Sequence, residues 1–188
     1  RRRLQFEQWL LLLLRTLLVV LIVLAVAEPY LAEGRFHVLP GVRAHRVIVL
    51  DGSYSMACVS DEVSRFDRAR QTAVRIVEAS GQGDGFTLIL MASPPQVVVG
   101  LPALEPSRVL QEIERLKPLD TSADLPATTA AIEDVLRAAR KEYPRLIREE
   151  VYFLTDLGRQ GWYPEFDSAE AAAQFQERAA RLAGSASL

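Results

Sequence analysis

The chain has 188 residues, a formal net charge of −2 at pH 7 and a sequence pI of about 5.8. That length suffices for one domain of ordinary size with its own core, plus a smaller extra segment. The charge balance has no basic excess, which argues against nucleic acid as a partner. Cys58 is the only cysteine, so neither an intrachain disulfide nor a cysteine-based zinc site can form.

The first predicted element is an apolar segment at residues 8–27, in which only Gln8, Arg15 and Thr16 are polar. A helix needs about 20 apolar residues to cross a bilayer core, so this segment is predicted to be a transmembrane helix. In a spanning helix, Arg15 would extend toward the N-terminal interface, where Trp9 would act as an anchor.

The flanking charges predict the orientation of this helix. Residues 1–7 begin with three arginines and form a basic flank, whereas Glu28 and Glu33 come first after the segment. The positive-inside rule therefore places the flank in the cytoplasm and the rest of the chain across the membrane. A signal peptide cleaved after Ala27 and a buried core helix are the alternatives, although Arg15 is unusual inside a signal peptide.

Residues 28–44 contain two prolines and two glycines without a sustained period, so they are predicted to be a linker. From residue 45 onward, patterns typical of strands and helices alternate. The predicted strands and helices, in chain order, are 46–50, 66–79, 86–91, 96–99, 106–116, 125–143, 151–154 and 167–182. Their alternation predicts an α/β fold with a doubly wound, mostly parallel sheet over residues 45–188.

Local signals refine this fold. The strand at 96–99 follows two prolines closely, so we expect it to be an antiparallel edge strand. The last helix is expected to begin with a capping box of Asp167 and Glu170 and to stop at Gly184. A doubly wound sheet would continue with another strand, so the domain is expected to be incomplete at its C-terminus.

Carboxylate and hydroxyl side chains follow two of the predicted strands. Asp51, Ser53 and Ser55 stand at alternate positions after the first strand, and Thr155-Asp156 follows the strand at 151–154. Ligands of such sheets bind at the carboxyl ends of the strands, so these side chains are expected to share one crevice. Oxygen ligands without His or Cys suit Mg²⁺, Mn²⁺ or Ca²⁺. An ordinary strand followed by a turn is the alternative.

These residues resemble the von Willebrand factor type A domain, whose metal-ion-dependent adhesion site has the pattern D-x-S-x-S after the first strand. Asp51, Ser53 and Ser55 match that pattern in full. The family's T-D-G turn is similar to Thr155-Asp156, with Leu157 in place of the glycine. The resemblance implies that the matching residues hold Mg²⁺ or Mn²⁺, with Asp156 acting through a water, and that a carboxylate of a protein partner completes the shell.

One family ligand is not matched. The family's threonine lies in a turn before a long helix, and Ala123 occupies that place here. Thr121 or Ser122 is the alternative source of the hydroxyl. The departure also leaves open a degenerate site in a metal-independent structural or assembly domain.

The order of basic flank, apolar helix, linker and D-x-S-x-S domain resembles the Bat (aerotolerance) proteins. The resemblance implies an inner-membrane location with the domain on the periplasmic side, and an earlier membrane helix before this sequence. It also implies a binding module that works with AAA+ ATPases of the MoxR type and with other von Willebrand type A proteins.

Enzymatic interpretations are disfavoured by the same residues. Neither Ser53 nor Ser55 lies in a G-x-S-x-G nucleophile motif, and an aspartyl-nucleophile phosphatase would have an acid at position 53. His37 and His45 are expected to be surface or linker residues, and the charged run at 145–150 a solvated helix end. We therefore expect a binding protein without catalytic residues.

Overall fold

The computed structural model describes residues 9, 12–18, 43–60, 62–158, 166 and 168–186. It divides into two compact units, Arg1–Val38 and Leu39–Leu188. In the first unit residues 12–18 are helical, and the Thr16 hydroxyl donates to the carbonyl groups of Leu12 and Leu13 at 3.0 and 2.9 Å. Over the described residues, no helix is both long and apolar enough for a membrane span. Most of the predicted span at 8–27 lies outside the described residues.

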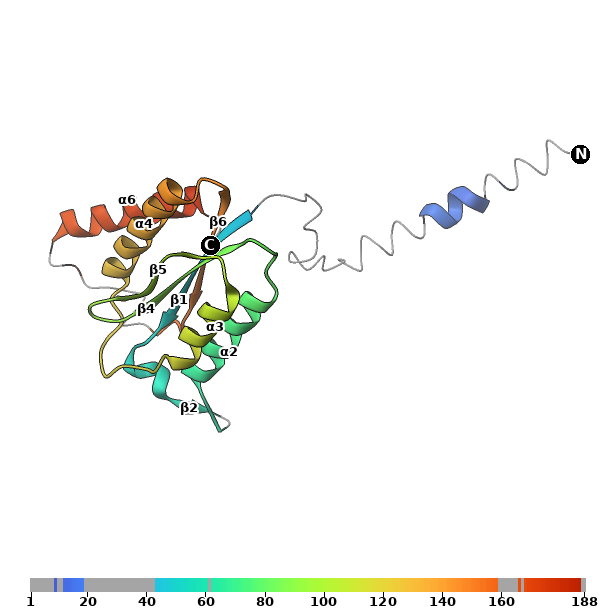
Figure 1. Cartoon of the computed structure of the whole chain (residues 1–188). Coiled ribbons are helices and arrows are strands. Elements are labelled where there is room, and N and C mark those ends of the chain that lie inside the picture. Colours follow the sequence, from blue (N-terminus) through green and yellow to red (C-terminus); the bar gives the residue numbers. More distant parts are fainter. Residues whose placement is uncertain are drawn as a thin grey trace, which may run out of the picture. The chain divides into compact units, whose positions relative to one another are not determined.

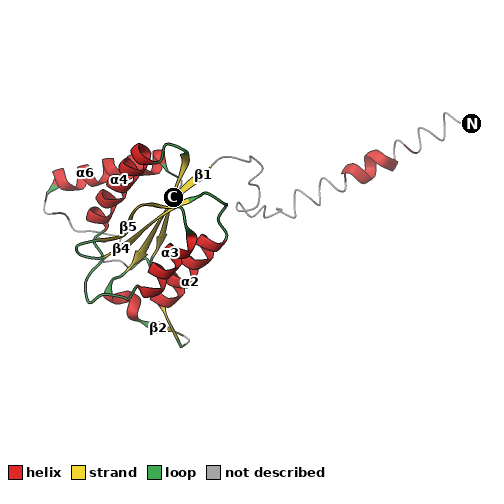
Figure 2. Cartoon of the chain, viewed as in Figure 1, coloured by secondary structure: helices red, strands yellow, loops and turns green. Residues whose placement is uncertain are grey.

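The second unit is built on a four-stranded sheet in the order β5-β4-β1-β6 (Figures 1 and 2). Its strands are β1 (Arg43–Asp51), β4 (Gly85–Met91), β5 (Gln96–Ala103) and β6 (Leu146–Leu154). β1 pairs in parallel with β4 and β6, and β5 pairs antiparallel with β4. The predicted mostly parallel sheet with an antiparallel edge strand is therefore confirmed.

Helices cover both faces of this sheet. The helices are α2 (Arg65–Glu78), α3 (Pro106–Arg115), α4 (Leu125–Glu142) and α6 (Ala169–Ser185). Figure 1 shows α2 and α3 on one face and α4 and α6 on the other. Alternate β1 residues divide between the two layers: Ile48 and Leu50 join the core cluster under α2 and α3, whereas Val47 and Val49 join the cluster under α4 and α6. This two-sided burial explains the unbroken apolar run of β1.

Two small elements connect β1 to α2. A 3-10 helix, η1 (Tyr54–Ala57), follows β1, and the short antiparallel pair β2 (Val59–Ser60) and β3 (Val63–Ser64) follows η1. Ser64 then caps α2 by accepting a hydrogen bond from the Asp67 amide. The connection therefore places the start of α2 near the end of β1.

The charged run at 145–150 is predicted to be a helix end, but residues 146–150 form the first half of β6. Glu150 is only 5% exposed, and it forms ion pairs with Arg46 at 2.7 Å and Arg148 at 2.8 Å. Glu149 pairs with Arg140 of α4 at 2.6 Å. These ion pairs neutralise the charges, so β6 can lie in the sheet although its first half has a polar sequence.

Three further expectations need correction. His45 is not a surface residue: it is 1% exposed in β1, and its Nε2 lies 2.8 Å from the Thr87 hydroxyl. β1 begins at Arg43, inside the predicted linker. α6 continues past Gly184 to Ser185, because Gly184 lacks the positive φ of a helix-ending glycine. Ser168 caps this helix, and both Asp167 and His37 lie outside the described residues.

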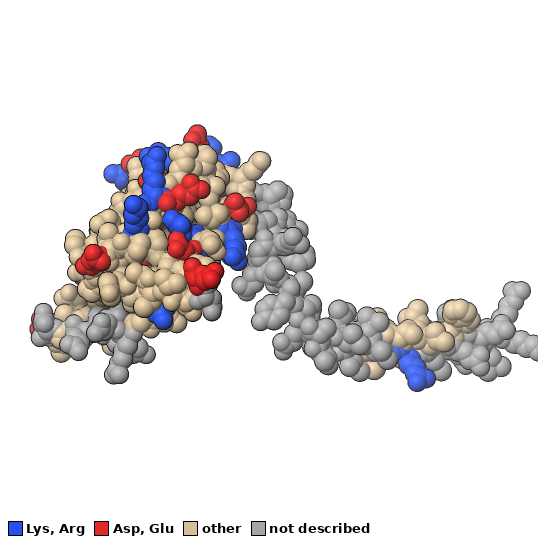
Figure 3. Space-filling view, turned by 90° about the horizontal axis from the view of Figure 1, so that it is seen from below, with Lys and Arg blue, Asp and Glu red and all other residues tan. Residues whose placement is uncertain are grey.

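Opposite charges are interspersed on the face of the second unit drawn in Figure 3, where Lys and Arg side chains lie among Asp and Glu. This mixture agrees with the small net charge of the chain.

Candidate functional site

Asp51 is the last residue of β1 and is held rigidly although it lies at the end of a strand. Its side chain is buried, with 2% of the residue exposed. Oδ1 accepts a hydrogen bond from the Ser53 amide at 2.9 Å, and Oδ2 accepts one from the Thr155 hydroxyl at 2.8 Å. The second bond joins β1 to the end of β6, so the two predicted strand ends do meet.

The backbone after Asp51 is fastened between two neighbouring segments. The Gly52 amide donates to the Met91 carbonyl at 2.9 Å, and the Gly52 carbonyl accepts from the Leu119 amide at 2.8 Å. A Cβ at position 52 would lie 2.7 Å from the Leu90 Cγ, which is too close. Glycine is therefore needed here for close packing of the loop against β4.

The two serines of the motif lie together. The Ser53 and Ser55 hydroxyl oxygens are 3.1 Å apart, and Ser55 lies in η1, so the backbone turns between them. Tyr54, between them, is 70% exposed, and its amide donates to the Thr121 carbonyl at 2.9 Å. The predicted gathering of the hydroxyls therefore arises from a turn rather than from a strand.

Asp156 completes the cluster from the end of β6. Its Oδ1 accepts from the Gly158 amide at 3.0 Å, and its Oδ2 forms an ion pair of 2.6 Å with the Arg65 guanidinium. Burial by itself raises the pKa of Asp156, but hydrogen bonds from Gly158, Arg65 and Ser55 together hold that pKa below its ordinary value. Asp156 is thus an ionised carboxylate linked to Ser55.

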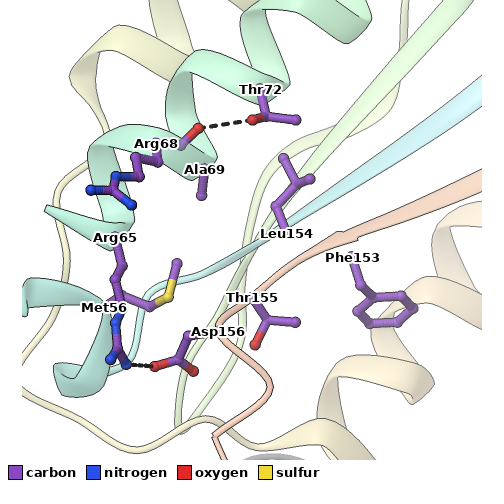
Figure 4. A pocket seen from close by; sticks show the side chains of 9 residues that line it. All are labelled: Met56, Arg65, Arg68, Ala69, Thr72, Phe153, Leu154, Thr155 and Asp156. Carbon is purple, nitrogen blue, oxygen red and sulfur yellow. Dashed lines mark hydrogen bonds and ion pairs between the residues drawn. The ribbon is translucent and has the colours of Figure 1, made fainter. Parts of the chain in front are cut away.

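A cavity of about 300 Å³ lies beside this cluster, between α2 and the end of β6. Figure 4 shows Arg65 extending from α2 to Asp156, with Thr155 next to the carboxylate and Arg68 one turn along the helix. The nine lining residues are Met56, Arg65, Arg68, Ala69, Thr72, Phe153, Leu154, Thr155 and Asp156. Arg65 is a residue of this cluster that the sequence did not reveal, since nothing in a lone arginine at a helix start points to a carboxylate far along the chain.

Residues 46–160 match the von Willebrand factor type A domain family, which is more than half of the chain. The chain belongs to this family. A search of curated proteins found no match. Type A domains are generally protein-interaction modules rather than enzymes.

Solved structures share the type A fold with this chain. BatB from Bacteroides thetaiotaomicron has 20% identity and a TM-score of 0.54, over 72% of this chain and 62% of that one. An aerotolerance-related membrane protein from Bacteroides fragilis has 18% identity and a TM-score of 0.54, over 71% and 62%. The SpRpn10 VWA domain has 14% identity and a TM-score of 0.52, over 73% and 69%. At these identities the likeness is one of fold, and the chain spans less than two thirds of the two Bacteroides structures.

The type A domain differs from the adhesion-site pattern at the turn before α4. Ala123 packs against the apolar cluster under α4 and α6, and Asp124 caps α4 by accepting from the Ala127 amide at 2.8 Å. The Thr121 hydroxyl donates to the Ser93 carbonyl at 3.1 Å. Ser122 lies in the same turn, but no described contact links its side chain to Asp51 or Asp156.

The donor chemistry of the type A site fits a hard cation. Asp51 and Asp156 supply carboxylate oxygens, and Ser53 and Ser55 supply hydroxyl oxygens, which is the ligand type that Mg²⁺ and Mn²⁺ prefer. Within the described ranges, no cluster of three or more His, Cys, Asp or Glu side chains offers another metal site. Two carboxylates leave room for water and for a ligand from outside the chain.

Proposed function

We propose that this type A domain binds a protein partner through a divalent cation, Mg²⁺ or Mn²⁺, at the carboxyl edge of its sheet. The observation that carries the proposal is the connected cluster of Asp51, Ser53, Ser55 and Asp156. Asp51 bonds through Thr155 to the end of β6, and the serine pair bridges toward Asp156. Four oxygen-bearing side chains from two distant segments thus converge at one place.

In this proposal Asp51, Ser53 and Ser55 hold the cation directly or through water, and Asp156 holds it through a water. Thr121 or Ser122 would supply a further hydroxyl in place of the family's threonine. The bound cation would supply positive charge and an open coordination position for a carboxylate of the partner. The chain's own contribution is to keep the Asp51 carboxylate buried and fixed in orientation.

We also propose that residues 8–27 anchor the domain in the inner membrane, with the domain on the periplasmic side. The support is the length and apolarity of that segment and its basic flank. A MoxR-type AAA+ ATPase and other type A proteins are the proposed members of the same complex. Extraction of membranes at alkaline pH tests the anchor: the chain should stay with the lipid, and a variant lacking residues 8–27 should be released.

A metal-independent assembly domain is the second candidate. Ala123 favours it, because a methyl group that packs against the apolar core stands where the family has a ligand. In that case the domain would bind its partners through its helices or the sheet edge, and Asp51 and the serines would only stabilise the loop.

Calorimetric titration of Mg²⁺ and Mn²⁺ into the full chain, purified in mild detergent, separates the two candidates. Asp51→Asn removes one negative charge while keeping the size of the side chain. Asp134→Asn is the matched control, because Asp134 is a surface residue whose side chain is 71% exposed and pairs only with Arg137 in the described contacts. Saturable binding that is lost in Asp51→Asn but kept in Asp134→Asn supports the cation-dependent function. No binding by the unmodified chain or by Arg65→Gln, which lacks the guanidinium paired with Asp156, supports the assembly domain.

A further inference from the structure

Arg65 places a positive charge next to the Asp156 carboxylate, which is proposed to help hold the cation. Its guanidinium lies 2.6 Å from Asp156 Oδ2, and the two residues are 91 positions apart in the sequence. The Asp156 side chain is 8% exposed, whereas the Arg65 side chain is 49% exposed. The carboxylate is therefore fixed in the protein, and the guanidinium is the member of the pair that can leave.

The local structure aims Arg65 at this position. Arg65 is the first residue of α2, its amide donates to the Cys58 carbonyl at 3.0 Å, and the Ser64 cap fixes the helix start. The η1 and β2–β3 connection thus carries Arg65 to the same edge of the sheet as Asp51. A charge-assisted bond of this geometry is stronger than a neutral hydrogen bond.

The pair limits how Asp156 can receive a cation. Each carboxylate oxygen already has a donor, since Oδ1 accepts from Gly158 and Oδ2 from Arg65. A divalent ion near Asp156 would also lie close to the guanidinium, and two positive charges at short range repel each other. The guanidinium therefore lowers the affinity of the site for the ion unless it turns away.

The cavity beside the pair offers space for a second position of the Arg65 side chain. Arg65 and Thr72 line the same space of about 300 Å³ along α2, as Figure 4 shows. The arginine can turn into this open space without moving the helix, because it lines the cavity and 49% of its side chain is exposed.

We propose that Arg65 is an internal competitor of the divalent cation: it neutralises Asp156 when no ion is held and sets the ion concentration at which the site fills. This inference rests on the proposed cation-dependent function. It assigns to Arg65 control of the affinity of the site, so that a partner carboxylate is bound only where cation is abundant enough to displace the arginine.

Titration of MgCl₂ and MnCl₂ into the full chain in detergent, followed by calorimetry, tests the inference. Arg65→Gln removes the charge, and we expect it to bind either ion at least about fivefold more tightly than the unmodified chain, a change in line with the loss of one ion pair. Arg65→Lys keeps the charge and should bind close to the unmodified chain. Arg70→Gln is the matched control, because Arg70 lies on the same helix but pairs with Asp67 at 2.8 Å.

The outcomes separate the inference from the function on which it rests. Equal affinities for Arg65→Gln, Arg70→Gln and the unmodified chain would overturn the inference and leave the cation-dependent function standing. Binding by Arg65→Gln alone would support the inference and show that the native site stays closed to these ions. No binding by any protein, with far-UV circular dichroism unchanged, would overturn both.

Discussion

The Thr155 hydroxyl donates a 2.8 Å hydrogen bond to the Asp51 carboxylate, which joins the ends of two parallel strands 104 residues apart in the sequence. The same oxygen accepts from the Leu157 amide at 3.1 Å, so Thr155 also shapes the turn after β6. One hydroxyl thus fixes both the orientation of Asp51 and the path of the chain toward Asp156.

Replacing Thr155 by valine is predicted to lower the free energy of unfolding by about 1–2 kcal/mol, because a buried carboxylate loses a donor. Thr155→Ser keeps the hydroxyl and should lose clearly less. Urea unfolding of both variants measures the difference. A larger loss in Thr155→Ser than in Thr155→Val would mean that the methyl group, rather than the bond to Asp51, stabilises this turn.

Gly52→Ala is predicted to destabilise the domain by about 1–3 kcal/mol, since the new methyl group would lie 2.7 Å from Leu90 in the core. The cost is steric and involves one neighbour. In a Leu90→Ala background the same substitution should therefore cost little, and a double-mutant cycle by urea unfolding measures the coupling. Additive losses in that cycle would rule out the clash as the cause.

Loss of Arg46 is predicted to lower the free energy of unfolding much more than loss of the surface residue Arg137. It is 6% exposed and pairs with Asp84 at 2.9 Å and with Glu150 at 2.7 Å. Arg46→Leu leaves two buried carboxylates without this cation and should cost about 3 kcal/mol or more. Arg137→Leu, which breaks a surface pair, should change the free energy of unfolding by less than about 1 kcal/mol. Similar effects of the two substitutions would contradict the prediction.

Because His45 is buried, the stability of the domain is predicted to depend on pH. Burial lowers the pKa of His45 from 6.5 to about 4, although the charge of Glu149 acts in the opposite direction. Between these pH values the unfolded chain takes up a proton that the folded chain does not, so stability falls as the pH falls. The expected loss from His45 between pH 7 and pH 5 is about 2 kcal/mol.

His45→Gln provides the comparison for this effect, because it removes the titrating group and keeps a hydrogen-bonding side chain near Thr87. Urea unfolding at pH 7 and pH 5 should show a smaller loss in the variant than in the unmodified chain. Any contribution of His37 is common to both proteins and cancels in the difference. The same loss in both proteins would mean that His45 is protonated in the folded state.

The alternation of strands and helices and the edge position of β5 follow from the order of residue types along the chain. The same order places Asp51, Ser53 and Ser55 at a strand end. These features depend on near neighbours: strands covered on both faces need unbroken apolar runs, helices need apolar residues at helical spacing, and a turn motif lies within a few residues. The family match over residues 46–160 agrees with this reading.

Which polar residues are buried, and with which residues they pair, depends on the folded arrangement of distant segments. His45 lies in the core because Thr87 accepts or donates across the β1–β4 pairing, and Glu150 belongs to a strand because Arg46 neutralises it. The Arg65–Asp156 pair likewise joins segments 91 residues apart. Such pairs form between segments that are far apart in the sequence and are brought together by the fold. A local pattern of residue types does not show which distant segments will meet.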